Sequence, residues 1–160
     1  MVSSDEFREA MSRLGTSVNL VTTDGPAGRR GLTVSAVCSV TDLPPTVLVC
    51  INRANRSHDV VRDNGVLCVN ILAGRHEALS KAFASSSTSS EERFARGEWD
   101  TLVTGAPALI DAPTALDCGI AGRLEVGTHT IFICEVERIR MREAENLVYF
   151  NRAFHHLNPA

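Results

Sequence analysis

The stretch that decides the fold is GLTVSAVCSVTD, residues 31–42, in which apolar and small polar side chains alternate. The apolar set is Leu32, Val34, Ala36, Cys38 and Val40, and between them stand Thr33, Ser35, Val37, Ser39 and Thr41. A two-residue period is typical of a β-strand with one apolar face, so we expect one strand here. The opposite face is rich in hydroxyls, which either contact solvent or meet a polar ligand.

Several further segments have strand patterns. Residues 17–23, 46–52, 66–72 and 146–150 are strand-like, and two long strands joined by a turn at Gly127 follow residue 105. The loop DGPAGRRG, residues 24–31, predicts a hairpin between the first of these and the opening stretch. Short helices are expected over 3–15, where Ser3 and Glu6 have capping-box spacing, over 56–65 and over 76–84. The pattern predicts an all-β barrel with helical decorations, folded as a single domain over residues 1–160.

Composition excludes several functional classes. A net charge of −3 gives no indication of a nucleic-acid partner. No apolar run reaches the roughly 18 residues needed to span a bilayer, so we expect no membrane partner. The five cysteines lie in apolar runs without a CxxC pair, which predicts reduced, buried thiols and no metal site. With no signal-peptide pattern at the N-terminus, we expect a cytoplasmic protein.

Polar residues gather where the strand over 46–52 ends. Asn52 closes that strand, and Ser57 stands at the expected start of the next helix. The N–H groups of a first helical turn can bind phosphate, so these residues and the hydroxyls of 33–39 could converge on a phosphorylated ligand. Ser57 could equally be an ordinary N-cap. Arg29 and Arg30, beside the hairpin loop, could contact an anionic group.

His129 and three aromatic residues remain open to two interpretations each. His129 follows the Gly127 turn, where it is either a surface residue or a catalytic one. Phe83, Phe94 and Trp99 flank the loop SSSTSSEE, residues 85–92. They form either a cluster that anchors this loop or a lid over a flat aromatic ligand.

Longer motifs carry a resemblance that covers nearly the whole chain. These are FREAMSRLGTSVNLVTTDGPAGRRGLTVSAVCSVTDLPPTVLVCIN (7–52), LCVNIL (67–72), ERF (92–94), GTHTIF (127–132) and LVYFNRAFH (147–155), in this order. The sequence resembles the short-chain flavin reductases, which include the reductase components of two-component monooxygenases and the flavin reductase of pyrimidine degradation. The stretch FASSSTSS departs from relatives that carry Gly after Phe-Ala.

The resemblance implies a split β-barrel of the FMN-binding type that works as a homodimer. It implies that NADH, or NADPH, reduces FMN or FAD, and that the reduced flavin diffuses to a flavin-dependent monooxygenase. His129 would lie near the nicotinamide as the catalytic residue. The cofactor-binding residues that the resemblance implies are Thr33, Val34, Ser35, Ala36, Val37, Cys38, Ser39, Asn52, Ser57, Phe83, Tyr149, Phe150 and Arg152.

Three functions follow from this sequence. The first is an NAD(P)H:flavin oxidoreductase that exchanges its flavin with solvent. The second is a split-barrel protein with tightly bound FMN, acting as an oxidase or flavin-binding module. The third is a barrel with a degenerate site that binds no flavin.

Overall fold

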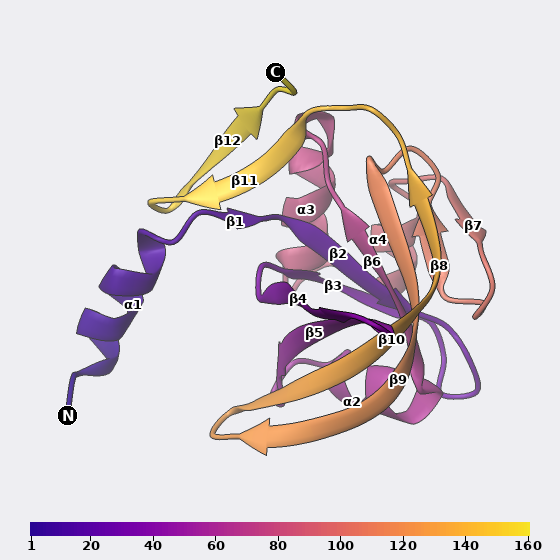
Figure 1. Ribbon diagram of the computed structural model, residues 1–160, viewed down its shortest axis with the longest axis horizontal. Helices are drawn as coiled ribbons and strands as arrows, with labels where there is room; N and C mark the ends of the chain where they lie inside the picture. The colour runs from indigo at the N-terminus through magenta and orange to yellow at the C-terminus, as the bar shows by residue number, and fades with distance from the viewer.

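The computed structural model describes all 160 residues, and an antiparallel sheet of seven strands forms its body (Figure 1). The strand order is β3-β2-β6-β9-β10-β5-β4. These strands are β2 (Asn19–Thr23), β3 (Arg30–Val34), β4 (Val37–Asp42), β5 (Pro45–Asn52), β6 (Val66–Ile71), β9 (Thr114–Val126) and β10 (His129–Met141). The predicted hairpin of β2 with β3 and the predicted Gly127 turn between β9 and β10 are both confirmed. Gly127 adopts a positive φ of 54°, which suits glycine in a tight turn.

The stretch over 31–42 is not one strand, as its alternation predicted, but two. β3 and β4 are separated only by Ser35 and Ala36, yet they form opposite edges of the seven-stranded sheet. The chain must therefore turn sharply between them, and the sheet curls so that both edges face one core. Leu32 of β3 is buried in the same apolar cluster as Val49 of β5, which is next to β4. This curled sheet is the predicted split barrel.

Two smaller sheets and five short helices surround the body. Strands β1 (Thr16–Ser17), β11 (Asn146–Phe150) and β12 (Ala153–Leu157) form one sheet, and β7 (Trp99–Thr101) pairs with β8 (Pro107–Leu109). The helices are α1 (Ser4–Ser12), α2 (His58–Asn64), the 3₁₀ turn η1 (Gly74–His76), α3 (Glu77–Ala84) and α4 (Ser90–Phe94). None of the helices has the length and apolar character needed to cross a membrane.

Helix α1 projects away from the body of the molecule (Figure 1). Its predicted capping box is present, with the Ser3 hydroxyl accepting the Glu6 N–H and the Glu6 carboxylate accepting the Ser3 N–H. The helix ends at Ser12, with Arg13 as its C-cap, so Gly15 does not end it as expected. The helix buries none of its side chains, and Phe7 and Met11 are 56% and 45% exposed.

The aromatic residues beside the serine-rich loop pack on one another. The ring centroids of Phe83 and Phe94 lie 5.2 Å apart, and those of Phe94 and Trp99 lie 4.9 Å apart. Phe83 is 1% exposed. The anchoring interpretation of this cluster is therefore confirmed, and Phe83 cannot act as a lid.

All five cysteines are free, but not all are buried as predicted. Cys68, Cys118 and Cys134 are buried, Cys50 is half-buried and Cys38 is exposed. Cys38 differs because β4 is an edge strand whose residues from Cys38 onward are exposed.

Candidate functional site

A hollow of about 750 Å³ opens where the β3–β4 corner meets the start of β10 and helix α1. Five residues predicted for the site or its strand face line it: Ser35, Ala36, His129, Tyr149 and Arg152. The rest of the wall is mostly apolar, from α1, the β9–β10 hairpin and Cys50. We call this the apolar hollow. A mostly apolar wall with a few polar groups suits a flat organic ring.

His129 lies at the mouth of this hollow and is held by its strand. It pairs across the sheet with Asn52 of β5, so the two side chains share a face. The Nδ1 atom of His129 lies 2.9 Å from the Thr128 hydroxyl. The imidazole is exposed, and no carboxylate contacts it. This environment suits a residue that binds a ligand by hydrogen bonds better than one activated as a base.

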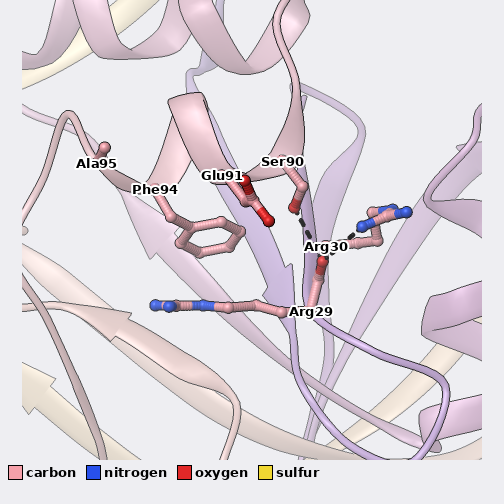
Figure 2. Close-up of a pocket in the computed structure, with 6 residues that line it drawn as sticks. All are labelled: Arg29, Arg30, Ser90, Glu91, Phe94 and Ala95. Atoms are coloured by element: carbon pink, nitrogen blue, oxygen red, sulfur yellow. Dashed lines mark hydrogen bonds between the residues drawn. The ribbon is translucent and has the colours of Figure 1, made fainter.

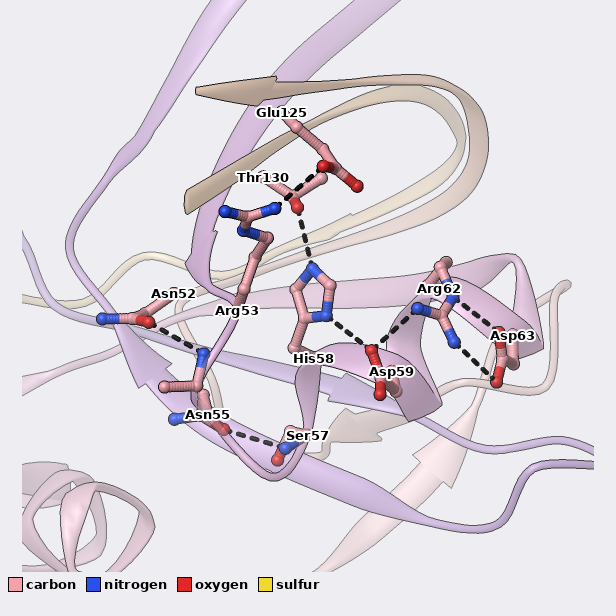
Figure 3. A network of polar contacts seen from close by, with 11 residues as sticks. Asn52, Arg53, Asn55, Ser57, His58, Asp59, Arg62, Asp63, Glu125 and Thr130 are labelled. Carbon is pink, nitrogen blue, oxygen red and sulfur yellow. Dashed lines mark hydrogen bonds and ion pairs between the residues drawn. The ribbon is translucent and has the colours of Figure 1, made fainter. Parts of the chain in front are cut away.

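The loop after β5 is tied to the β9–β10 hairpin (Figure 3). The Arg53 guanidinium donates to Glu125 at 2.9 Å and to the Gly127 carbonyl at 2.6 Å. The Asn52 side-chain oxygen accepts the Ala54 N–H at 2.9 Å. Asn52 therefore shapes the loop with its amide oxygen, and Arg53 fixes that loop against the turn that carries His129.

A buried histidine, His58, makes a second contact between the segment after β5 and the start of β10. The Nε2 atom of His58, which is 4% exposed, lies 2.8 Å from the hydroxyl of Thr130 (Figure 3). The Nδ1 atom lies 2.9 Å from the carboxylate of Asp59. Because Thr130 is the neighbour of His129, this contact fixes the start of α2 relative to the proposed site strand.

Ser57 occupies the N-cap position of α2, as one interpretation expected, but its side chain does not cap the helix. Its hydroxyl makes no capping hydrogen bond and instead donates to the Gly31 carbonyl at 3.3 Å. The Asn55 side chain accepts the Ser57 N–H at 2.9 Å and so shapes the turn before α2. Ser57 therefore contacts β3 through the Gly31 carbonyl, and it lines a second hollow.

This second hollow, of about 220 Å³, is lined by cations and hydroxyls. Its lining residues are Arg30, Arg56, Ser57, Thr88, Ser89, Ser90 and Arg93, with no carboxylate. We call it the arginine hollow. The Arg93 guanidinium donates to the Gly31 carbonyl at 2.8 Å and to the Ser85 carbonyl at 2.5 Å, and its Nε is buried without a partner.

The three arginines have no acidic partner among them. Burial, followed by the charges of Arg30 and Arg56, lowers the pKa of the Arg93 guanidinium. Like charges held together destabilise one another unless an anion is bound between them. Guanidinium groups bind phosphate through paired, charge-assisted hydrogen bonds. The residues of the arginine hollow therefore fit a phosphate group.

Several residues implied by the resemblance lie outside both hollows. The Thr33 hydroxyl donates to the Ser80 carbonyl at 2.6 Å. Val34 is 6% exposed and belongs to the core. Phe83 is 1% exposed, and its ring would clash with a Cβ at Gly31, so we assign it to packing beneath β3 instead of to ligand contact. Val34 can offer a ligand only its backbone.

The remaining residues of the stretch lie on β4. Val37 is half-buried against the core, whereas Cys38 and Ser39 are exposed along the edge of the sheet. Phe150 is exposed, and its ring centroid lies 5.8 Å from that of His155. None of these four residues lines the apolar hollow, although Val37 and Phe150 directly follow the lining residues Ala36 and Tyr149.

Five lining residues of the arginine hollow were not predicted: Arg56, Thr88, Ser89, Ser90 and Arg93. Arg56 and Arg93 are distant in sequence from Arg30, and only the fold brings them together. The available signal was the ERF motif that contains Arg93, one of the motifs that carry the resemblance.

Comparisons with known proteins agree with this geometry. Residues 11–158 match the model of the flavin reductase like domain. The chain belongs to the flavin reductase family. The family and the split-barrel fold that the sequence resemblance implied are thus confirmed.

Three similar proteins illustrate the match. The FMN reductase (NADH) RutF of Pseudomonas syringae pv. syringae is 54% identical over 157 residues, which cover 98% of this chain and 88% of that protein. The crystal structure of a putative flavin reductase from Haemophilus somnus 129PT is 46% identical, with a TM-score of 0.94 over 98% of this chain and all of that one. The styrene monooxygenase flavin reductase from Pseudomonas putida S12 is 25% identical, with a TM-score of 0.84 over 97% and 98% of the two chains.

Proposed function

We propose that this flavin reductase oxidises NADH and reduces free FMN or FAD, which then leaves to supply a flavin-dependent monooxygenase. The observation that carries the proposal is the arginine hollow at the start of β3, a cation cluster suited to the flavin phosphate. The name of the Pseudomonas syringae relative supports the substrate pair, and that of the styrene monooxygenase reductase supports an oxygenase partner.

The proposed flavin runs from the arginine hollow to the apolar hollow. Arg30, Arg56 and Arg93 bind its phosphate, and Ser57 adds a hydroxyl. The segment from Thr33 to Ser39 follows the ribityl chain and the polar edge of the isoalloxazine. A backbone N–H or hydroxyl between Ser35 and Ser39 donates to the ring edge that gains negative charge on reduction.

The chemistry itself belongs to the cofactors, as hydride passes from nicotinamide C4 to flavin N5. The protein contributes by holding the two rings face to face and by excluding water between them. His129, at the mouth of the apolar hollow, orients the nicotinamide carboxamide by a hydrogen bond. Tyr149 and Phe150 shape the nicotinamide side, and Arg152, paired with Glu9 at 2.7 Å, fixes α1 at the rim.

We propose a homodimer as the working form. Exposed apolar side chains gather on α1 and on the tip of the β9–β10 hairpin, which project on the same side of the molecule (Figure 1). They include Phe7 and Met11 of α1, Leu14 just after that helix, and Leu124 and Val126 at the end of β9. Contiguous exposed apolar surface of this kind typically marks a protein interface. Light scattering after gel filtration tests it, since a monomeric mass at micromolar protein would refute the dimer.

We propose the cytoplasm as the site of the reaction. The exposed free thiol of Cys38 is compatible with a reducing compartment.

The test of the proposed activity is NADH oxidation, followed by the loss of its absorbance, with and without added FMN or FAD and with NADPH in parallel. Rapid oxidation only when free flavin is added supports a reductase of diffusible flavin. Oxidation without added flavin, by protein that is isolated yellow, supports tightly bound FMN instead. No oxidation with any pair refutes the reductase function.

A further inference from the structure

The residues that precede His129 are bonded to one short segment, residues 53–58, which runs from the end of β5 to the first residue of α2 (Figure 3). The Arg53 guanidinium donates to the Gly127 carbonyl at 2.6 Å. The Arg53 N–H donates to the Thr128 carbonyl at 2.9 Å. One end of this segment therefore holds the turn that leads into His129.

The residue that follows His129 is bonded to the other end of the same segment. The Nε2 atom of His58 lies 2.8 Å from the Thr130 hydroxyl, and both side chains are buried. The His58 ring also packs on Phe132, with the ring centroids 5.7 Å apart. Because successive side chains of a strand face opposite sides, His58 contacts β10 from the side opposite to His129. This buried contact fixes the backbone of β10 behind the His129 side chain.

The middle of the segment lines the arginine hollow. Arg56 and Ser57 are two of its lining residues. The Ser57 hydroxyl donates to the Gly31 carbonyl at 3.3 Å, which holds Ser57 against β3. Ser57 and His58 are neighbours in the chain, so two adjacent residues connect the arginine hollow to the strand that carries His129.

Another wall of the arginine hollow has its own set of contacts. There the Ser90 hydroxyl donates to the Arg29 carbonyl at 2.9 Å. The Arg29 guanidinium carbon lies 4.0 Å from the centroid of the Phe94 ring (Figure 2). These contacts join α4 to the end of the β2–β3 loop and do not include residues 127–130. Of these two walls, it is the segment 53–58 that is bonded to the site of His129.

We propose that His58 is a positioning residue for the nicotinamide, which acts through Thr130 on His129. Its contact with Thr130 sets the position of His129 relative to the phosphate end of the flavin at Ser57, and so the spacing of the two rings. Reacting atoms must approach to about 3 to 3.5 Å, so a small displacement of His129 weakens productive binding of NADH. The proposal rests on the proposed function, because it requires the flavin phosphate in the arginine hollow and the nicotinamide at His129.

The test compares Thr130→Val, which removes the hydroxyl but keeps a branched side chain of similar size, with Thr130→Ser, which keeps the hydroxyl. Loss of one hydrogen bond corresponds to roughly a twofold to twelvefold change in an equilibrium constant. We expect Thr130→Val to raise the NADH KM by about threefold to tenfold and to leave kcat within about twofold. Thr130→Ser should keep both values within about twofold of the wild type.

His58→Phe removes the same contact from the other partner and keeps a ring beside Phe132. It should raise the NADH KM as Thr130→Val does, and it serves as the second variant if Thr130→Val folds poorly. The FMN dissociation constant should stay within about twofold in every variant, since neither His58 nor Thr130 lines the arginine hollow.

Thr46→Val is the matched control. Thr46 is also buried, and its hydroxyl donates to the Pro44 carbonyl at 2.8 Å. It pairs with Glu135, at the end of the β5–β10 pair that is remote from His129. This variant also loses a buried hydroxyl, so its thermal stability reports that cost while its NADH KM should not change.

A double variant shows whether the effect is transmitted by His129. If it is, Thr130→Val adds nothing to the rise in NADH KM caused by His129→Ala, because no imidazole remains to be positioned. Full addition of the two effects would refute the proposal, as would an unchanged KM in Thr130→Val and His58→Phe or an equal rise in Thr46→Val. Absence of NADH oxidation by the wild-type protein, or equal affinity of that protein for FMN and riboflavin, would refute the proposed function instead.

Discussion

Removal of Arg56 should separate phosphate recognition from recognition of the flavin ring. Arg56 is exposed, lines the arginine hollow and makes no side-chain hydrogen bond, so Arg56→Ala leaves the fold intact. A hydrogen bond to a charged group contributes roughly 1.5 to 3 kcal/mol. Exposure of Arg56 to solvent weakens its contribution to just below this range, about 1.4 kcal/mol, which is a tenfold change in affinity. We therefore expect the FMN dissociation constant to rise about tenfold.

Riboflavin provides the internal comparison, because it has the same ring and ribityl chain but no phosphate. Its dissociation constant should change by less than about twofold in the same variant. Fluorescence titration of both flavins at low and high salt measures these effects, and salt should weaken FMN binding alone. The matched control is Arg138→Ala, which removes the same charge from an exposed position outside every hollow described here. An equal loss of affinity for FMN and riboflavin in Arg56→Ala would refute the assignment of Arg56 to the flavin phosphate. The same loss of FMN affinity in the Arg138→Ala control would refute it as well.

Three further perturbations have defined outcomes. His129→Ala should raise the NADH KM more than it lowers kcat, whereas a variant that binds both substrates normally yet has no turnover would give His129 a chemical role. A thiol reagent should modify Cys38 in the native protein but reach Cys118 and Cys134 only after unfolding. Burial raises the pKa of the thiols of Cys118 and Cys134, that of Cys134 to about 12. Fast modification of all five thiols in the native protein would contradict this prediction. Phe132→Ala, at a fully buried position in the barrel core, should lower the free energy of unfolding by about 3 to 5 kcal/mol in urea titrations, and a loss below about 1 kcal/mol would show that the core is not packed there.

Local signals in the sequence predicted most of the elements correctly. The αL residue at Gly65 ends α2, and the capping box of Ser3 and Glu6 begins α1, because both depend on the nearest few residues. The same local reasoning failed over 31–42. The alternation of apolar and polar residues is correct for each half of that stretch. It cannot show that Ser35 and Ala36 form a corner between strands at opposite edges of the sheet.

The candidate site divides in a similar way. His129 and Asn52 were both predicted, and the sheet register makes them direct neighbours. Arg56 and Arg93 were missed, because a cation cluster assembled from three remote segments leaves no spacing pattern in the sequence. Ser57 was predicted at the phosphate end, but its partner is the Gly31 carbonyl, which only tertiary structure could identify.

That Gly31 carbonyl has a kinetic consequence. It accepts from both Ser57 and Arg93, so one backbone oxygen fixes two groups of the proposed phosphate site before any ligand arrives. A preorganised site loses little conformational entropy on binding and needs no rearrangement to form or to open. A protein that must release its product flavin at every turnover benefits from such a rigid frame, because exchange is then limited by the strength of the contacts and not by slow movement of the chain.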